Sequence, residues 1–385
     1  MTHRRVIIIR NAAASDFGGG ERFPVFLAEA LKGSDYEPYI ISGSKRLLDF
    51  AASRQISHQR GWWWSRQQWS GRASLLFPFY CIWQCILTVY YLCVFIKLRP
   101  VVVHPQGKDD FIAATIAARL IGARVIWTDH ADLKHIWLNL SIWYKNPIGK
   151  LIYYVATLAS AITVVSKSEL ALITKHLPAR AHIRKRLVVV YNGVVDSSAE
   201  HPLTLQKDGI VRFISASRLV TDKGIGELID AFLALHTRHP QTELVLAGDG
   251  PDEAQFHTQA GNHPAIIFRG YVTNPLEAIS AADIYVHPTY HEGFSVALVE
   301  ASMLEKPIIA TSVGGNTEII SNEKTGLLVP AKHPEALEKA MERLLKDAAF
   351  RKQLGSNARV QFLSNFEFNH IVHSQFIPLY KGDHV

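Results

Sequence analysis

Short apolar runs of strand type alternate with longer helical segments throughout the second half of this chain. Segments such as GIGELIDAFLAL and PLEAISAA separate most of the runs. Strands that alternate with helices at this spacing predict a parallel sheet covered by helices on both faces. The runs are VRFISA (211–216), TELVLAGD (242–249), AIIFRG (265–270), ADIYVHP (282–288), PIIAT (307–311) and GLLVP (326–330).

The first half repeats this pattern more loosely. At 385 residues, the chain is also longer than one typical domain core requires. We therefore expect an α/β protein with two Rossmann-like domains facing each other across a cleft, over residues 1–195 and 196–365, and a final helix over 366–385. The runs of the first half are RRVIIIR (4–10), PVVVH (100–104), ARVIWTDH (123–130), AITVVS (161–166) and RLVVVYNG (186–193).

Charge is unevenly distributed between the two halves. Residues 1–200 contain 25 Lys+Arg and 13 Asp+Glu, a net +12, whereas residues 201–385 contain 16 and 21, a net −5, which together give +7. Residues 50–108 contain no acidic residue. A solvated face, a nucleic acid and an anionic membrane could each explain this basic excess. Because no nucleic-acid recognition motif accompanies the charge, we do not expect nucleic-acid binding.

The three cysteines and the N-terminus both indicate a reducing compartment. Cys81, Cys85 and Cys93 lie in one apolar stretch without C-x-x-C spacing or a nearby histidine pair, so we predict buried thiols rather than a metal site or disulfides. The N-terminal sequence MTHRRVIIIRNA has too short an apolar core for a signal peptide. We expect a cytoplasmic protein whose first strand begins here.

The stretch HEGFSVALVE (291–300) predicts a loop that becomes a helix at Ser295. Gly293 disfavours a continuous helix, since glycine costs about 1 kcal/mol relative to alanine. Glu292 would then lie on the loop, and Glu300 would lie more than one helical turn beyond Ser295. The free N–H groups of the first turn would point back toward the loop. Such a site suits a long ligand that is negatively charged in its middle.

Other candidate residues also follow predicted strands, where ligands bind to parallel sheets. SRLVTDKG places Arg218 and Lys223 five residues apart, which suits a diphosphate, although an isolated pair of this kind is more often two surface cations. In ASDFGGGER, Gly19 and Gly20 precede the helical segment FPVFLAEAL and either let the backbone approach a phosphate or sugar or form a tight turn. The sequence lacks a full G-x-G-x-x-G at this point, so it gives little support to a dinucleotide site. His130, in WTDHADLKH, also ends a strand and is either an active-site residue or a structural histidine.

Residues 211–330 resemble the donor domain of the retaining glycosyltransferases of family 4, which have the GT-B fold and a group 1 donor domain. The resemblance rests on SRLVTDKG, GDGP (248–251), EGFSVALVE, GGNTE (314–318) and GLLVP. The first half resembles the family's acceptor domain less closely, through GGGER, VVVHPQG, TDH (128–130), VVSKSE and YNGV. The resemblance implies a hexosyltransferase that moves a sugar from a nucleotide-diphosphate sugar to a saccharide or lipid-linked saccharide during glycan or cell-envelope polysaccharide synthesis. It also implies that the final helix crosses back to the first domain.

The same resemblance assigns roles to the candidate residues. Glu292 would lie against the donor sugar, Glu300 would hold the ribose hydroxyls, and His130 would contact the transferred sugar. Arg218, Lys223 and the helix N-terminus would neutralise the diphosphate, whose charge grows as the glycosidic bond breaks. The catalytic candidates are therefore Glu292, His130, Arg218 and Lys223, and the donor-binding candidates are Glu300, Gly293, Phe294, Ser295, Gly19 and Gly20. Because the sequence has no D-x-D, we expect no metal and no cofactor besides the nucleotide-sugar co-substrate.

An aromatic and apolar stretch over residues 61–100 is unusual for a plain sugar transferase. Its segment 75–96 is long enough to cross a bilayer, but it is interrupted by Pro78 and Gln84 and followed directly by the strand PVVVH, so we do not expect it to cross. It is either a buried helix or a helix in the membrane interface. In the second case the anchors and the cations near lipid phosphates would be Trp62, Trp63, Trp64, Trp69, Arg66 and Arg72.

Since family members that act on lipid-linked acceptors use basic, apolar acceptor domains, we favour a membrane-carried acceptor. We therefore expect a peripheral protein on the inner face of the membrane. Two alternatives remain, namely a nucleotide-sugar epimerase of the same fold and a non-catalytic module that binds a nucleotide sugar or a membrane. The aromatic stretch disfavours the epimerase, and the intact donor-site residues disfavour the module.

Overall fold

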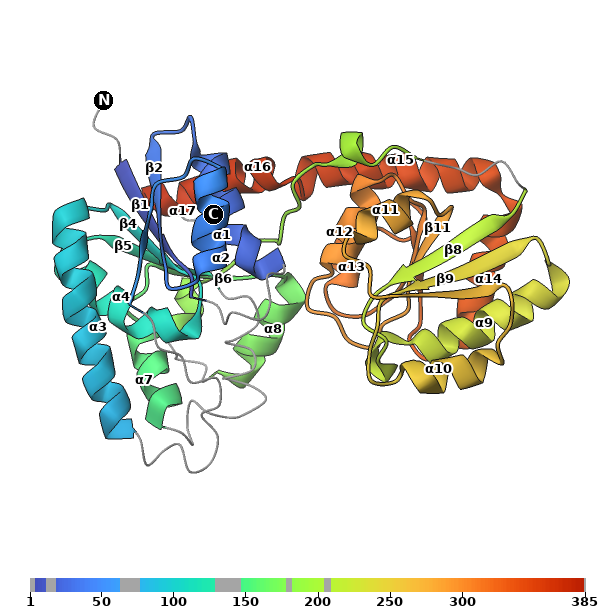
Figure 1. The fold of residues 1–385 in the computed structure, drawn as a ribbon, viewed down its shortest axis with the longest axis horizontal. Helices are drawn as coiled ribbons and strands as arrows, with labels where there is room; N and C mark the ends of the chain where they lie inside the picture. The colour runs from blue at the N-terminus through green and yellow to red at the C-terminus, as the bar shows by residue number, and fades with distance from the viewer. Residues whose placement is uncertain are drawn as a thin grey trace. The chain divides into compact units, whose positions relative to one another are not determined.

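The computed structural model describes residues 4–11, 19–62, 77–128, 147–177, 182–203 and 209–383. The chain forms two compact units, one made of residues 1–191 together with 371–385, and the other of residues 192–370 (Figure 1). Each unit is built on a parallel β-sheet, so both halves adopt the predicted α/β Rossmann-like architecture.

The sheet of the first unit has the order β3-β2-β1-β4-β5-β6-β7. Its central strands are buried on both faces, as expected for a parallel sheet covered by helices, and Val6, Ile7, Ile8 and Ile9 have no exposed surface. The strands are β1 (Arg4–Ile9), β2 (Tyr36–Ser42), β3 (His58–Arg60), β4 (Val102–Pro105), β5 (Arg124–Thr128), β6 (Ala161–Val164) and β7 (Leu187–Val189). The sequence did not predict β2 and β3, because Glu37 and Pro38 interrupt the apolar run of β2 and β3 has only three residues.

Helices connect these strands and cover the sheet. They are α1 (Gly19–Leu31), α2 (Lys45–Ser53), α3 (Phe77–Leu98), α4 (Lys108–Leu120), α7 (Pro147–Ala156) and α8 (Lys167–His176). The helix α1 begins four residues before the predicted segment FPVFLAEAL, so Gly19 and Gly20 lie in its first turn rather than in the preceding loop.

The C-terminal segment belongs to the first unit, which confirms the predicted return of the chain. The short helix α16 (Phe368–Ile371) leads into this segment, which continues as the π-helical turn η6 (Val372–Phe376) and α17 (Ile377–Lys381). The ring of Phe376 packs edge-on against Phe23 with a centroid distance of 6.0 Å, and Tyr380 packs against Tyr36 at 5.5 Å. These aromatic contacts place the end of the chain in the core of the first unit.

The sheet of the second unit has the order β10-β9-β8-β11-β12-β13. Each of the six strands predicted for this half is present, as β8 (Val211–Ala216), β9 (Thr242–Ala247), β10 (Ile266–Gly270), β11 (Ile284–His287), β12 (Ile308–Thr311) and β13 (Leu327–Val329). The helices are α9 (Ile225–Arg238), α10 (Glu253–Ala260), α11 (Pro275–Ser280), α12 (Val296–Met303), α13 (Asn316–Ile319), α14 (Pro334–Lys346) and α15 (Ala348–Asn365). The main core lies between the sheet and α9, α10 and α14, and it contains Phe213, Phe232 and Val286.

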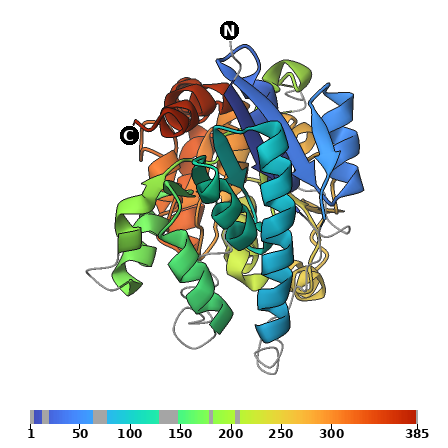
Figure 2. The same cartoon turned by 90° about the vertical axis from the view of Figure 1, so that its left-hand side faces the viewer.

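The long helix α3 is buried on one side only, so the interpretation of residues 75–96 as a buried helix holds for that side and is wrong for the other. Only one stripe of it is buried, and the opposite side chains are exposed. Figure 2 shows no described element in front of the helix. The prediction of buried thiols is therefore wrong for Cys85 and Cys93, which are exposed, whereas Cys81 is half-buried. Because α3 connects β3 to β4 and both strands belong to one sheet, the helix does not carry the chain across a membrane.

Candidate functional site

The predicted donor residues follow two adjacent strands of the second unit. In the order β10-β9-β8-β11-β12-β13, the winding of the chain reverses between β8 and β11. Ligands of doubly wound sheets bind at this reversal point, outside the carboxyl ends of the strands. Arg218 and Lys223 lie in the connection after β8, and Glu292 lies in the loop after β11. The topology therefore brings both predicted motifs to the same sheet edge.

The two connections are fastened to each other by their backbones. The N–H of Tyr290 donates a hydrogen bond to the Asp222 carbonyl oxygen at 2.9 Å. Gly224 has a φ of +67°, and a Cβ at this position would lie 2.1 Å from the Pro288 carbonyl oxygen. Only glycine permits this conformation and this approach without strain. The contact fixes Lys223 beside the loop that carries Glu292.

The loop segment GGNTE supports Glu292 from the other side. Gly314 has a φ of +46°, and a Cβ there would lie 1.9 Å from the Glu292 carbonyl oxygen, which the N–H of Gly315 also binds at 3.2 Å. Gly293 differs, because a Cβ added to it would meet no atom within 4 Å. Gly314 is therefore required for packing, whereas Gly293 leaves open space beside Glu292.

Glu292 is held ionised by two basic side chains. Its Oε2 lies 2.9 Å from Lys223 Nζ and 3.3 Å from His287 Nε2. Burial alone would raise the pKa of Glu292, but the hydrogen bonds from His287 and Lys223 outweigh burial and lower this pKa to about 2. The site therefore keeps a fixed negative charge at neutral pH.

His287 is a site residue that the sequence analysis did not identify. Its side chain is only 3% exposed, and burial lowers its pKa, so the ring is neutral. The Nε2 atom that faces Glu292 also lies 3.2 Å from the Ser295 hydroxyl. The available signal was its position as the last residue of β11, five residues before Glu292.

The helix α12 begins as predicted, with Ser295 as its N-cap. The Ser295 hydroxyl accepts a hydrogen bond from the Leu298 N–H at 3.3 Å. Among the described residues, the N–H groups of Val296 and Ala297 have no hydrogen-bond partner. These free donors, together with the helix dipole, favour a negatively charged group at this end of α12.

Glu300 differs from Glu292 in its environment. It lies on α12, and burial raises its pKa to about 7. No cationic side chain in the described ranges pairs with this partly buried carboxyl group, so it keeps its proton more readily. The two glutamates of the motif therefore carry opposite pKa shifts.

Arg218 is the exposed cation of the site. No other described residue forms an ion pair or hydrogen bond with its guanidinium group, so it is available to a ligand. The GDGP loop supports the backbone around it, since a Cβ at Gly248 would lie 2.0 Å from the Ser217 carbonyl oxygen and one at Gly250 would lie 2.2 Å from that of Leu219.

Several predicted site residues cannot be placed in this arrangement. Phe294 is buried and packs edge-on against Phe366 at 5.8 Å, so its ring supports the loop from within the core. Trp62 is 57% exposed and stacks on Tyr90 at 4.9 Å in the first unit. The other predicted residues lie outside the described ranges, namely His130, Trp63, Trp64, Trp69, Arg66 and Arg72. Within the described ranges, no cluster of three or more His, Cys, Asp or Glu could hold a metal ion.

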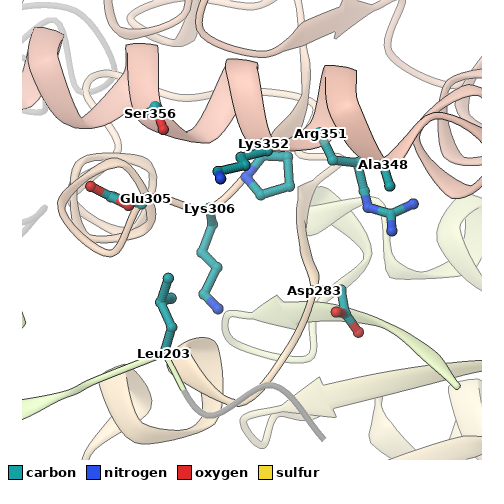
Figure 3. Close-up of a pocket in the computed structure, with 9 residues that line it drawn as sticks. Leu203, Asp283, Glu305, Lys306, Ala348, Arg351, Lys352 and Ser356 are labelled. Atoms are coloured by element: carbon teal, nitrogen blue, oxygen red, sulfur yellow. The ribbon is translucent and has the colours of Figure 1, made fainter. Parts of the chain in front are cut away.

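A cavity of about 430 Å³ lies in the second unit at the opposite sheet edge. Figure 3 shows Lys306 extending into it between Leu203 and Asp283. Lys306 Nζ donates hydrogen bonds to the carbonyl oxygens of Ser280 at 2.8 Å and Ala282 at 2.6 Å, and burial lowers its pKa to about 8. Lys306 therefore ties the end of α11 to the start of β12, and this cavity is not the predicted donor site.

The sequence matches two family models that together span most of the chain. Residues 17–197 match Glycosyltransferase Family 4, and residues 200–361 match Glycosyl transferases group 1. Over 154 residues the chain is 30% identical to the capsular polysaccharide biosynthesis glycosyltransferase CapM of Staphylococcus aureus. The aligned stretch covers 39% of this chain and 40% of the relative. The matched stretches span about half the length of the curated relatives.

Solved structures share the whole fold at low sequence identity. A glycosyltransferase from Rickettsia africae has a TM-score of 0.75 at 18% identity over 99% of both chains. Anabaena HepE in complex with UDP and glucose has a TM-score of 0.70 at 16% identity over 98% of this chain and 99% of that chain. These likenesses establish the GT-B fold.

With one unit matching each of the two family models and the GT-B fold spanning both, the chain belongs to the group 1, family 4 glycosyltransferases.

Proposed function

We propose that the protein transfers a hexosyl group from a nucleotide-diphosphate sugar to a saccharide or lipid-linked saccharide, with retention of anomeric configuration and without a metal ion. The observation that carries this proposal is the arrangement of charge at the β8/β11 edge. Lys223 and a helix N-terminus flank a carboxylate that stays ionised at neutral pH, and Arg218 lies in the connection after β8 at the same sheet edge.

The charges suit the separation that occurs when a glycosidic bond to a diphosphate breaks. The leaving diphosphate gains negative charge, which Arg218, Lys223 and the free N–H groups of α12 would stabilise. The sugar gains positive charge at its anomeric carbon, which the Glu292 carboxylate would stabilise. Lys223 binds Glu292 and would share its donors between Glu292 and the diphosphate. These interactions strengthen in the transition state, so they act on kcat.

Glu300 would bind the ribose hydroxyls, and His287 would position Glu292. We infer metal independence because the side-chain cations supply the charge that a divalent ion supplies elsewhere. We further propose that His130 contacts the transferred sugar, as its strand-end position in the sequence suggests. The basic first half favours an acceptor presented at an anionic membrane, on the cytoplasmic face.

Product analysis with a nucleotide-sugar panel and lipid-linked saccharides tests this proposal. We expect an acceptor-dependent product whose anomeric configuration, measured by NMR, matches that of the donor, and turnover that persists in chelator. Inversion at the anomeric carbon would contradict the retaining mechanism. Activity that is lost in chelator and restored by magnesium or manganese would contradict metal independence. Conversion of the donor to an isomer without acceptor would indicate the epimerase instead.

A further inference from the structure

The outward face of α3 is apolar along its whole length. Figure 2 shows the helix along the front of the first unit with no described element over it. Five of its large apolar side chains are 45–66% exposed, and Cys93 is exposed between them. We call these six residues the outward stripe, which consists of Phe79, Ile82, Ile86, Val89, Cys93 and Ile96.

The outward stripe is as regular as the buried one. Its members are spaced by three and four residues in alternation, so they lie on one side of the helix. The residues buried against the unit occupy the opposite side and are Tyr80, Gln84, Leu87, Tyr91 and Phe95. A helix of 22 residues is about 33 Å long, and a continuous exposed apolar stripe of this length marks an interaction surface.

We propose that the outward stripe lies in the headgroup and acyl boundary of an anionic membrane, with α3 parallel to the membrane plane. An in-plane helix with one apolar side buried in lipid is a known way of holding a protein at a bilayer. The in-plane orientation follows from the topology, since α3 joins two strands of one sheet and packs along α4. The inference extends the proposed function by naming the surface where a lipid-linked acceptor would be met.

Charge distinguishes a lipid surface from a second copy of this chain as the occupant. Arg60, Lys97 and Arg99 are exposed around α3, and residues 50–108 contain no acid. In a symmetric dimer through α3 these cations would meet a surface that offers them no acidic partner within that segment. Anionic headgroups would attract them, which strengthens binding roughly fivefold per cation near the surface.

The residues that flank the outward stripe also fit lipid better than a coiled coil. Coiled-coil pairing uses charged side chains beside the apolar seam. The flanking positions here include Trp83, Cys85, Tyr90 and Leu92, none of which is charged. Trp62 is exposed where it stacks on Tyr90, and tryptophan is enriched at membrane interfaces.

Vesicle flotation with the full chain tests the proposal. The wild type should float with phosphatidylcholine vesicles that contain phosphatidylglycerol, and I82E/V89E should bind them about tenfold more weakly or worse, because two exposed apolar anchors are replaced by anions. V360E is the matched control, since Val360 is 67% exposed on α15 of the second unit, and it should bind like the wild type. K97Q/R99Q should bind the anionic vesicles about 30-fold more weakly and should bind neutral vesicles no differently from the wild type.

Cys93 provides a direct probe of the stripe. In C81S/C85S, an environment-sensitive fluorophore on Cys93 should shift to the blue with anionic vesicles and be quenched by spin-labelled lipids. Unchanged thermal melts would show that the variants remain folded.

Absence of wild-type binding, or equal binding by I82E/V89E, would overturn the proposal. A dimer that I82E/V89E dissociates, measured by light scattering, would instead assign the stripe to a second copy. The flotation assay contains no donor or acceptor. If the protein fails to bind vesicles but still transfers sugar to a soluble saccharide, only the proposed membrane surface is rejected. Membrane binding without any transfer rejects the proposed function alone.

Discussion

Glu292 and Glu300 are eight residues apart, yet their environments shift their pKa values in opposite directions. Hydrogen bonds from His287 and Lys223 outweigh burial at Glu292 and lower its pKa to about 2. At Glu300, burial raises the pKa to about 7. The Glu292 carboxylate therefore supplies charge to the site. The Glu300 carboxylate can accept hydrogen bonds from a ligand, but its ionisation lowers the stability of the protein.

Ionising Glu300 in the folded protein is unfavourable, so we expect Glu300→Gln to increase the stability of the protein by an amount that depends on pH. Because the folded pKa is raised from 4.5 to about 7, the folded state binds more protons between these pH values. The contribution of proton binding at Glu300 to the free energy of unfolding is fully present below pH 4.5 and is lost as the pH rises to 7. A pKa raised from 4.5 to about 7 corresponds to about 3 kcal/mol of folding free energy.

Denaturant unfolding of both proteins at pH 5 and pH 8 measures this effect. The excess stability of E300Q over the wild type should increase with pH and approach about 3 kcal/mol at pH 8. A difference that stays constant over this range would mean that Glu300 does not titrate abnormally.

At the scale of the elements, two glycines of the site differ in their surroundings. Gly314 is closely packed and Gly293 faces open space, so alanine should have different effects at the two positions. Gly314→Ala places a Cβ 1.9 Å from the Glu292 carbonyl oxygen at a positive φ, so it should cost about 2–4 kcal/mol of stability. Gly293→Ala meets no atom within 4 Å and should change the free energy of unfolding by less than about 0.5 kcal/mol.

G293A should nevertheless weaken donor binding if the donor occupies the open space beside Glu292. Isothermal calorimetry with the donor nucleotide sugar, alongside thermal melts of both variants, measures the two effects separately. Donor affinity equal to that of the wild type in G293A would place the donor elsewhere.

Sequence patterns identified the elements of the second unit better than those of the first. Six apolar runs became β8 to β13, and Ser295 caps α12 as expected, because short buried strands and helix caps have strong local signals. The strand β2 has Glu37 and Pro38 in its sequence, which hides its burial. His287 was missed because its partners, Glu292 and Ser295, come together only through the loop after β11.

At the scale of the whole molecule, the end of the chain completes the core of the first unit. His104 is fully buried, with Nδ1 2.7 Å from the Tyr380 hydroxyl and Nε2 2.6 Å from the Thr128 hydroxyl. The Thr163 hydroxyl donates to Thr128 Oγ1 at 3.0 Å, so Thr128 donates to Nε2 and the Nδ1–H donates to Tyr380. Burial lowers the pKa of His104 to about 3, which agrees with this neutral ring.

Tyr380→Phe should therefore destabilise the first unit by about 1–3 kcal/mol, because the buried Nδ1–H of His104 loses its acceptor. Hydrogen exchange should increase in β4 and β5 and remain unchanged in β8 to β13. The matched substitution Tyr154→Phe removes a hydroxyl from a side chain that is 67% exposed and should have no measurable effect. Equal exchange in Y380F and the wild type would show that the tail does not stabilise this core.

The measurement that most directly tests nucleotide-sugar binding at the β8/β11 edge is thermal unfolding with UDP, GDP, ADP and their common sugars, for the wild type and Glu300→Ala. One nucleotide at 100 times its Kd should stabilise the wild type by about 2.7 kcal/mol, or roughly 5–10 °C, and shift the variant much less. That result would establish the donor site and name its base. If no nucleotide shifts the wild type, or if the variant shifts equally, Glu300 does not hold the donor and the proposed site is wrong.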